Sequence, residues 1–141
     1  MTISKSIHVK RAPADAFRLF TEQIGKWWPL KEGFSYGRER AQSVFIEGRV
    51  GGRFYERFSD GTEFEVGRVT AYEPPHLVVF SWRGPDWEGA TEVAVRFAPD
   101  GDGTRLELEH RGWDVGPKAL EQGKLFERGW DTVLARYAAA A

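Results

Sequence analysis

The chain contains 141 residues, of which 41% are hydrophobic and 14% aromatic, and these proportions exclude an intrinsically disordered protein. Its 20 basic and 21 acidic residues give a formal net charge of −1, which excludes the concentrated positive charge that nucleic-acid binding requires. The absence of cysteine excludes disulfides, thiolate metal sites and a cysteine nucleophile.

The N-terminal region predicts a strand followed by a helix. Over residues 3–10, apolar and polar residues alternate, which is typical of a half-buried strand. Residues 12–24 contain a proline suited to a first helical turn and an apolar stripe at helical spacing, and Gly25 is expected to end this helix. Residues 29–40 show little periodicity and are expected to form a loop.

The middle of the chain predicts a series of strands separated by short turns. Gly67 lies where the apolar positions of one strand change parity, which indicates a bulge or a sharp bend. Turn residues such as Asp60-Gly61 separate the periodic segments. Six strands are expected here, at residues 42–47, 53–58, 63–72, 77–82, 91–99 and 104–111.

The C-terminal region predicts one long helix over residues 118–139, in which apolar residues recur at steps of three and four. Consecutive strands with short turns form an antiparallel sheet, and a helix about 30 Å long can cover one of its faces. A strongly bent sheet wrapped around one helix leaves space between them. We therefore expect an α+β fold with a cavity, in a single domain spanning residues 1–141.

Several common sites are absent from the sequence. There is no Gly-x-Ser-x-Gly motif, and the glycine-rich residues 48–52 precede a strand rather than a Gly-Lys-Ser/Thr sequence. No two histidines stand at a metal-ligand spacing, so we predict neither a metal nor a cofactor. No run of ~18 apolar residues and no signal-peptide pattern is present. We therefore expect a cytoplasmic protein with no membrane insertion.

Aromatic residues and one histidine are the candidates for lining the cavity, because small-molecule sites are mostly apolar with a few polar groups. His110 continues the inward parity of its strand, and it is either a hydrogen-bonded core histidine or a polar group at the cavity. The alternative for the tryptophans is core packing. The predicted lining residues are Trp28, Tyr55, Phe80, Trp82, Phe97, His110, Trp113, Phe126 and Trp130.

The strand carboxylates have a different expected role. They alternate along the strands with arginines nearby, which favours solvated cross-strand ion pairs over an acid–base dyad. This group comprises Glu56, Glu63, Glu65, Glu107 and Glu109.

One stretch of the chain resembles a known superfamily. Residues 44–56, VFIEGRVGGRFYE, resemble the V-x-x-x-x-G-G-x-F segment of the SRPBCC superfamily, which is START-related and birch-pollen-allergen-like. Further matches are GRV at 67–69, EPP and LVVFSW within 73–82, TRLELEH at 104–110 and GW at 129–130. The branch it resembles most is the C-terminal domain of the activator of the heat-shock protein 90 ATPase.

The excess of arginine over lysine, 14 to 6, is typical of GC-rich bacterial genomes.

The resemblance implies a helix-grip fold, with a curved antiparallel sheet of about seven strands around a long C-terminal helix and short helices after the first strand. Members of the superfamily bind lipids and other hydrophobic compounds, some catalyse cyclisation, and others engage the chaperone. We therefore predict binding of a small hydrophobic or amphipathic molecule in the cavity, without chemistry of its own.

Two alternatives remain open at this point. One is a cyclase- or hydrolase-type enzyme using the same cavity, with His110 as proton carrier and Tyr55 stabilising an oxyanion. The other is an interaction module for a chaperone partner or a homodimer, with the loops around Trp28 and Trp87 as contacts.

Overall fold

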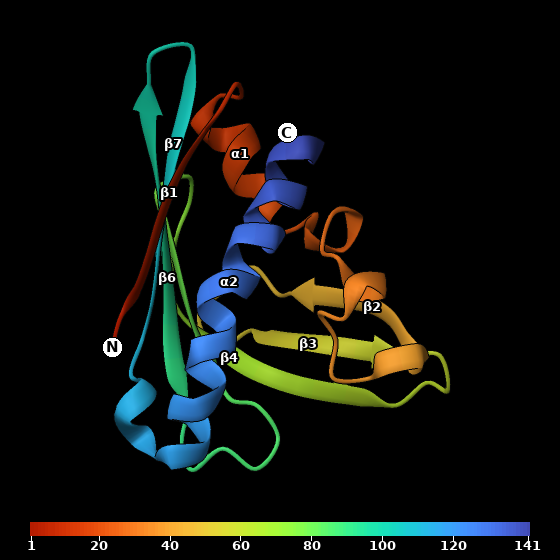
Figure 1. The fold of residues 1–141 in the computed structure, drawn as a ribbon. Helices are drawn as coiled ribbons and strands as arrows, with labels where there is room; N and C mark the ends of the chain where they lie inside the picture. The colour runs from red at the N-terminus through yellow and green to blue at the C-terminus, as the bar shows by residue number, and fades with distance from the viewer.

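The order of elements is a strand, a group of short helices, six strands and a long helix (Figure 1). The computed structural model describes residues 1–141. The elements are β1 (Ile3–Val9), α1 (Pro13–Phe20), η1 (Ile24–Lys26), η2 (Leu30–Glu32), η3 (Arg38–Arg40), β2 (Ala41–Ile46), β3 (Arg53–Phe58), β4 (Glu63–Glu73), β5 (Leu77–Trp82), β6 (Thr91–Asp100), β7 (Gly103–Arg111), η4 (Trp113–Val115) and α2 (Pro117–Ala140), where η denotes a 3-10 helix.

All seven strands form one antiparallel sheet in the order β1-β7-β6-β5-β4-β3-β2. The predicted α+β helix-grip architecture is confirmed: the sheet curves around α2, and the short helices follow the first strand (Figure 1). The predicted loop over residues 29–40 contains two short helices, η2 and η3.

The first helix is shorter than predicted. It ends at Phe20, and the side-chain hydroxyl of Thr21 donates a hydrogen bond of 2.8 Å to the carbonyl oxygen of Phe17. Hydroxyl side chains that bond back to the backbone in this way compete with regular helix geometry. The backbone continues only in the 3-10 turn η1, so the apolar stripe is divided between two elements.

The sheet bends sharply within β4, as the parity change at Gly67 predicted. Phe54 of β3 pairs with Gly67, but the next residue, Tyr55, pairs with Glu65, so Val66 is an extra residue on β4. A side chain at position 67 would overlap the carbonyl oxygen of Ser81 on β5. Figure 1 shows the result: β2 and β3 run across the direction of β6 and β7.

Helix α2 is fixed to the rest of the molecule at both of its ends. At its start, the carboxylate of Glu88 accepts backbone hydrogen bonds from Lys118 (3.0 Å) and Ala119 (3.3 Å). These bonds satisfy N–H groups that have no partner within the helix. Near its end, the buried Tyr137 hydroxyl donates to the carbonyl oxygen of Ala16 in α1 at 2.7 Å. The two ends of the helix are therefore tied to the loop between β5 and β6 and to α1.

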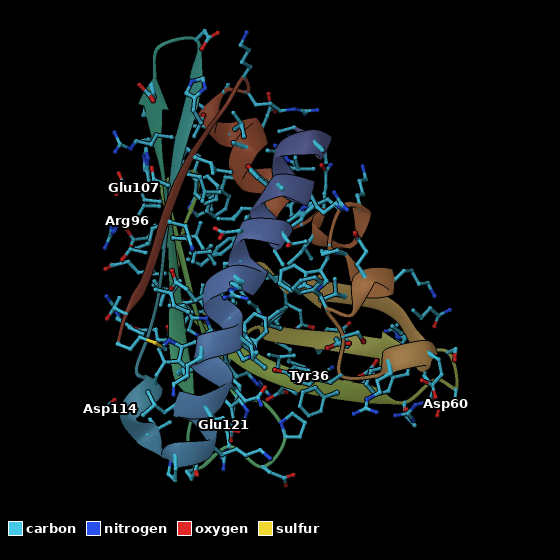
Figure 2. All side chains as sticks on the ribbon, viewed as in Figure 1. Tyr36, Asp60, Arg96, Glu107, Asp114 and Glu121 are labelled. Carbon is cyan, nitrogen blue, oxygen red and sulfur yellow. The ribbon has the colours of Figure 1, made fainter.

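The faces of the sheet differ in chemistry. The concave face and the helices enclose one cluster of 28 buried apolar residues, so both halves of the bent sheet share a core. The outer face carries charged residues, and Figure 2 shows Arg96 and Glu107 directed away from α2. The predicted cross-strand pairs occur here: Glu63 lies 3.0 Å from Arg53 and 3.2 Å from Arg57. Neither α-helix has an apolar stretch long enough to cross a bilayer.

The bend yields a prediction for Gly67→Ala. The added methyl group collides with the Ser81 carbonyl, and relieving the collision moves one half of the sheet relative to the other. We expect the free energy of unfolding to fall by about 1–3 kcal/mol, measured by urea denaturation. The control is Thr70→Ala on the same strand, whose side chain is exposed. Its effect should be about 0.5 kcal/mol. Equal stability of Gly67→Ala and the wild type would contradict a sterically enforced bend.

Candidate functional site

A cavity of about 250 Å³ lies between α2 and the bent part of the sheet. It is open at one side, where residues 33–36 and the exposed side chain of Leu125 form part of its border. The lining residues come from α2, from the segment after η1, and from β2 to β5. They are Trp28, Gly33, Phe34, Ser35, Tyr36, Val44, Phe54, Glu56, Val66, Trp82, Gln122, Leu125, Phe126, Gly129, Trp130 and Val133.

Aromatic rings form most of the wall. The ring centroids of Trp28 and Trp130 are each about 6 Å from that of Trp82, at 6.0 and 5.8 Å. Phe54 and Phe126 pack edge-on against Trp82 at 5.2 and 5.3 Å. Edge-to-face packing at these distances is the favoured arrangement for aromatic pairs. The wall is therefore apolar and is held in place before any ligand arrives.

Glu56 is the one charged residue among those that line the cavity, and its side chain is only 4% exposed. It points inward because it shares the parity of Phe54 on β3. Ser35 donates its hydroxyl to one carboxylate oxygen, and the backbone N–H of Tyr36 donates to the other at 3.1 Å. Burial raises the pKa of this carboxyl, and these hydrogen bonds oppose the rise. The same contacts hold the segment 33–36 against the sheet.

Tyr36 supplies a second polar group to the cavity. Its hydroxyl oxygen accepts a hydrogen bond of 2.9 Å from the indole N–H of Trp82, while no protein acceptor takes the proton of the hydroxyl. In Figure 2, Tyr36 is labelled over the strands β3 and β4, beside α2. Burial, together with the nearby charge of Glu56, raises the pKa of Tyr36 to about 12, so the hydroxyl stays protonated at neutral pH. It is a hydrogen-bond donor available to a ligand.

His110 is fully buried beside this site, and both of its ring nitrogens have partners. The indole N–H of Trp130 donates to Nδ1 at 3.0 Å, so the proton of the neutral ring is on Nε2. Nε2 donates to the hydroxyl of Thr91 at 2.7 Å, and that hydroxyl donates to the carbonyl oxygen of Trp82 at 2.8 Å. Burial lowers the pKa of His110 to about 3. The ring therefore connects α2 to the sheet and has no free nitrogen for proton transfer.

The structure brings four of the nine predicted residues together in the cavity lining, namely Trp28, Trp82, Phe126 and Trp130. Four others, Phe80, Phe97, His110 and Trp113, are buried in the core without lining the cavity. Phe80 packs on Phe54, Phe97 packs on Phe17 of α1, and Trp113 packs on His110.

Two further side chains do not lie where they were expected. Tyr55 lies on the opposite face of β3 from Glu56, stacked on Phe45 and covered by the guanidinium of Arg53, because alternate residues of a strand face opposite sides. Trp87 is only 3% exposed and packs against Trp113, so its own ring is not a contact surface, whereas Arg83, Asp86 and Glu88 of the loop around it are exposed.

The polar residues of the cavity were not predicted from the sequence. Glu56 was grouped with the solvated carboxylates, and its position between Phe54 and Phe58 on the inward parity is the signal that distinguishes it. Ser35 and Tyr36 belong to an aperiodic segment, and only the tertiary fold brings them to the cavity. No group of three or more histidine, aspartate or glutamate side chains is arranged to hold a metal ion.

The sequence matches one family model over residues 10–141, the family described as activator of Hsp90 ATPase homolog 1-like protein. No curated protein matches the chain.

Solved structures are similar over almost the whole chain. The anthrahydroquino-γ-pyrone synthase Txn09 is 31% identical with a TM-score of 0.67, and the match covers 99% of this chain and 96% of the synthase. Protein MLL2253 from Mesorhizobium loti is 18% identical with a TM-score of 0.73, covering 99% and 95% of the two chains. The Aha1 dimer from Colwellia psychrerythraea is 20% identical with a TM-score of 0.72 over the same shares. The last two show the fold alone.

The buried histidine predicts a pH dependence of stability. The pKa of His110 is about 3 in the folded protein against 6.5 for an exposed histidine, so the unfolded chain binds the proton more tightly. Its contribution to stability is complete above pH 6.5 and is lost as the pH falls from 6.5 toward 3. Between about pH 7 and about pH 5 we expect this residue to lower the free energy of unfolding by about 2 kcal/mol.

The measurement is urea denaturation at both pH values for the wild type and for His110→Gln, which lacks the titrating ring. The difference between the two proteins isolates His110 from the carboxylates they share. The exposed His76 provides the control, since His76→Gln should keep the wild-type pH dependence. An equal loss of stability in His110→Gln and the wild type would contradict a neutral buried ring.

Proposed function

Because the chain belongs to the activator of Hsp90 ATPase homolog 1-like family, we propose that its cavity binds a small, compact molecule with aromatic or alicyclic rings and at least one hydrogen-bonding oxygen. The observation that carries this proposal is the composition of the cavity. Aromatic side chains form its wall, and one carboxyl and one phenol, those of Glu56 and Tyr36, are turned into it. Such a combination is typical of small-molecule sites.

The size and charge of the cavity narrow the class of ligand. Its volume of about 250 Å³ lies below the roughly 300–1,000 Å³ of sites for drug-sized ligands, which favours a compact ring system over a long acyl chain. An anionic ligand would bring a second negative charge into an apolar space beside Glu56, which is unfavourable. A neutral ligand with a hydroxyl or carbonyl oxygen meets an acceptor at Glu56 and a donor at Tyr36.

The similar synthase supports this class of ligand. Its name, anthrahydroquino-γ-pyrone synthase, describes a multi-ring compound that carries hydroxyl and carbonyl oxygens, and the protein is 31% identical to this chain. The enzyme alternative with His110 as proton carrier has no support in the geometry, since both ring nitrogens are engaged within the core. Ligand binding is accordingly the primary proposal.

A second copy of the chain is the other binding partner that we propose. The similar Colwellia protein is described as a dimer, which supports a homodimer here as a proposal. Leu125 on α2 is 66% exposed and would be available to such a contact. A chaperone partner and the cytoplasmic location remain predictions of the sequence.

Blocking the cavity provides a direct test. Gln122 lines the cavity from α2, and Gln122→Trp places a large ring there, whereas Lys124→Trp adds the same ring at an exposed position of the same helix. We expect isothermal titration with 2-naphthol to show saturable binding to the wild type and to Lys124→Trp. Gln122→Trp should bind at least ~10-fold more weakly, a loss of about 1.4 kcal/mol. Equal affinity in both variants would place the binding elsewhere.

A matched pair of ligands tests the role of charge. 2-Naphthoate carries the rings of 2-naphthol but adds a carboxylate, which is repelled by Glu56. We expect the wild type to prefer 2-naphthol, and Glu56→Gln to reduce this preference about 10-fold, since one unit charge is removed from the cavity. The control, Glu107→Gln, changes an exposed outer-face carboxylate and should leave the preference intact. An unchanged preference in Glu56→Gln would show that the naphthyl ring does not bind beside this carboxylate.

A further inference from the structure

Glu56 and Tyr36 present complementary halves of a proton-transfer site. The carboxylate of Glu56 interacts with neutral donors, the Ser35 hydroxyl and the backbone N–H groups of Tyr36 and Gly37, and it makes no salt bridge. It therefore keeps lone pairs for a proton from a ligand. The Tyr36 hydroxyl has its oxygen occupied by the Trp82 N–H, so its proton is the part left for a ligand. One residue can accept a proton while the other donates a hydrogen bond.

We propose that this pair catalyses enolisation of a cyclic ketone bound in the cavity, with Tyr36 holding the carbonyl oxygen and Glu56 removing a proton from the adjacent carbon. The inference rests on the proposed binding function and adds a reaction to it. The C–H bond breaks and an O–H bond forms on Glu56, while the electron pair moves onto the carbonyl oxygen. The proton then returns from Glu56 to a carbon of the enolate. Atoms and charge balance without a further reactant.

The surroundings of each group suit its step. Burial makes the Glu56 carboxylate a stronger base than an exposed glutamate, because it raises the pKa of the conjugate acid. The Tyr36 hydroxyl remains protonated at neutral pH and can donate to the oxygen on which negative charge develops. The apolar aromatic wall lowers the local dielectric constant, which strengthens that hydrogen bond.

Positioning comes from elements that do not touch the ligand's reacting atoms. The Trp82 indole fixes the direction of the Tyr36 hydroxyl, and Ser35 together with the Tyr36 backbone fixes the Glu56 carboxylate. The lining contributed by α2, by β2 to β5 and by the segment 33–36 contains no other charged group and no other titratable one. The dependence of the reaction rate on pH should therefore follow the protonation of the Glu56 carboxyl.

The test uses 2-tetralone, a neutral bicyclic ketone, in deuterated water. NMR follows the replacement by deuterium of the protons on the carbon that joins the aromatic ring to the carbonyl group. Binding is measured in parallel by isothermal titration. We expect the wild type to accelerate exchange above the buffer rate. The wild-type rate should rise with pH and level off above an apparent pKa higher than the 4.5 of an exposed glutamate.

Two variants separate catalysis from structure. Glu56→Gln should lower the catalysed rate about 100-fold and abolish its pH dependence while still binding the ketone. Tyr36→Phe keeps the ring and should also lower the rate about 100-fold, so it carries the test if Glu56→Gln does not fold. Glu107→Gln, on the outer face, should exchange at the wild-type rate.

The outcomes distinguish this inference from the binding proposal. Saturable binding of 2-tetralone to the wild type without exchange above the buffer rate would overturn the enolisation site alone. Undiminished exchange in a folded Glu56→Gln or Tyr36→Phe would do the same. Absence of binding to the wild type would overturn the cavity proposal, and this inference with it.

Discussion

The bend in β4 is the constraint on which the cavity depends. Position 67 has no room for a side chain, because the carbonyl oxygen of Ser81 occupies that space. The extra residue Val66 turns the strand at the same point. The β2–β3 half of the sheet consequently runs across the other strands. Since α2 is held at its ends by Glu88 and Tyr137, it cannot follow that half. The space left between them is the site.

The aromatic residues divide into a solid cluster and an open one, and Trp82 belongs to both. On the core side, the carbonyl oxygen of Trp82 accepts a hydrogen bond from Thr91, which is in turn bonded to His110. The ring of His110 packs there against Trp113. On the other side the ring of Trp82 forms the cavity wall and its indole N–H orients Tyr36. The packed core thus fixes Trp82, and Trp82 in turn fixes the Tyr36 hydroxyl that faces a ligand. A preorganised wall lowers the entropic cost of binding.

The sequence predicted the architecture better than it predicted the site. Strands and the long helix follow from local periodicity, and Gly67 marked the bend because the parity of β4 changes there. The site depends on contacts between segments distant in sequence, such as Ser35 with Glu56, and no local pattern contains them. His110 was correctly expected to point inward, but its partners Thr91 and Trp130 could not be identified before the strands and helix were placed together.

The most direct measurement is an NMR titration of the six indole N–H signals with 2-naphthol. Three of these groups belong to tryptophans that line the cavity, Trp28, Trp82 and Trp130. Trp87 and Trp113 are buried away from the cavity, and Trp27, which packs against Trp28, is assigned to neither set. If a ligand enters between α2 and the bent sheet, the three wall signals shift together in a saturable manner and the two core signals stay in place. Saturation that leaves the wall signals unmoved, or that moves only the core signals, would contradict the account.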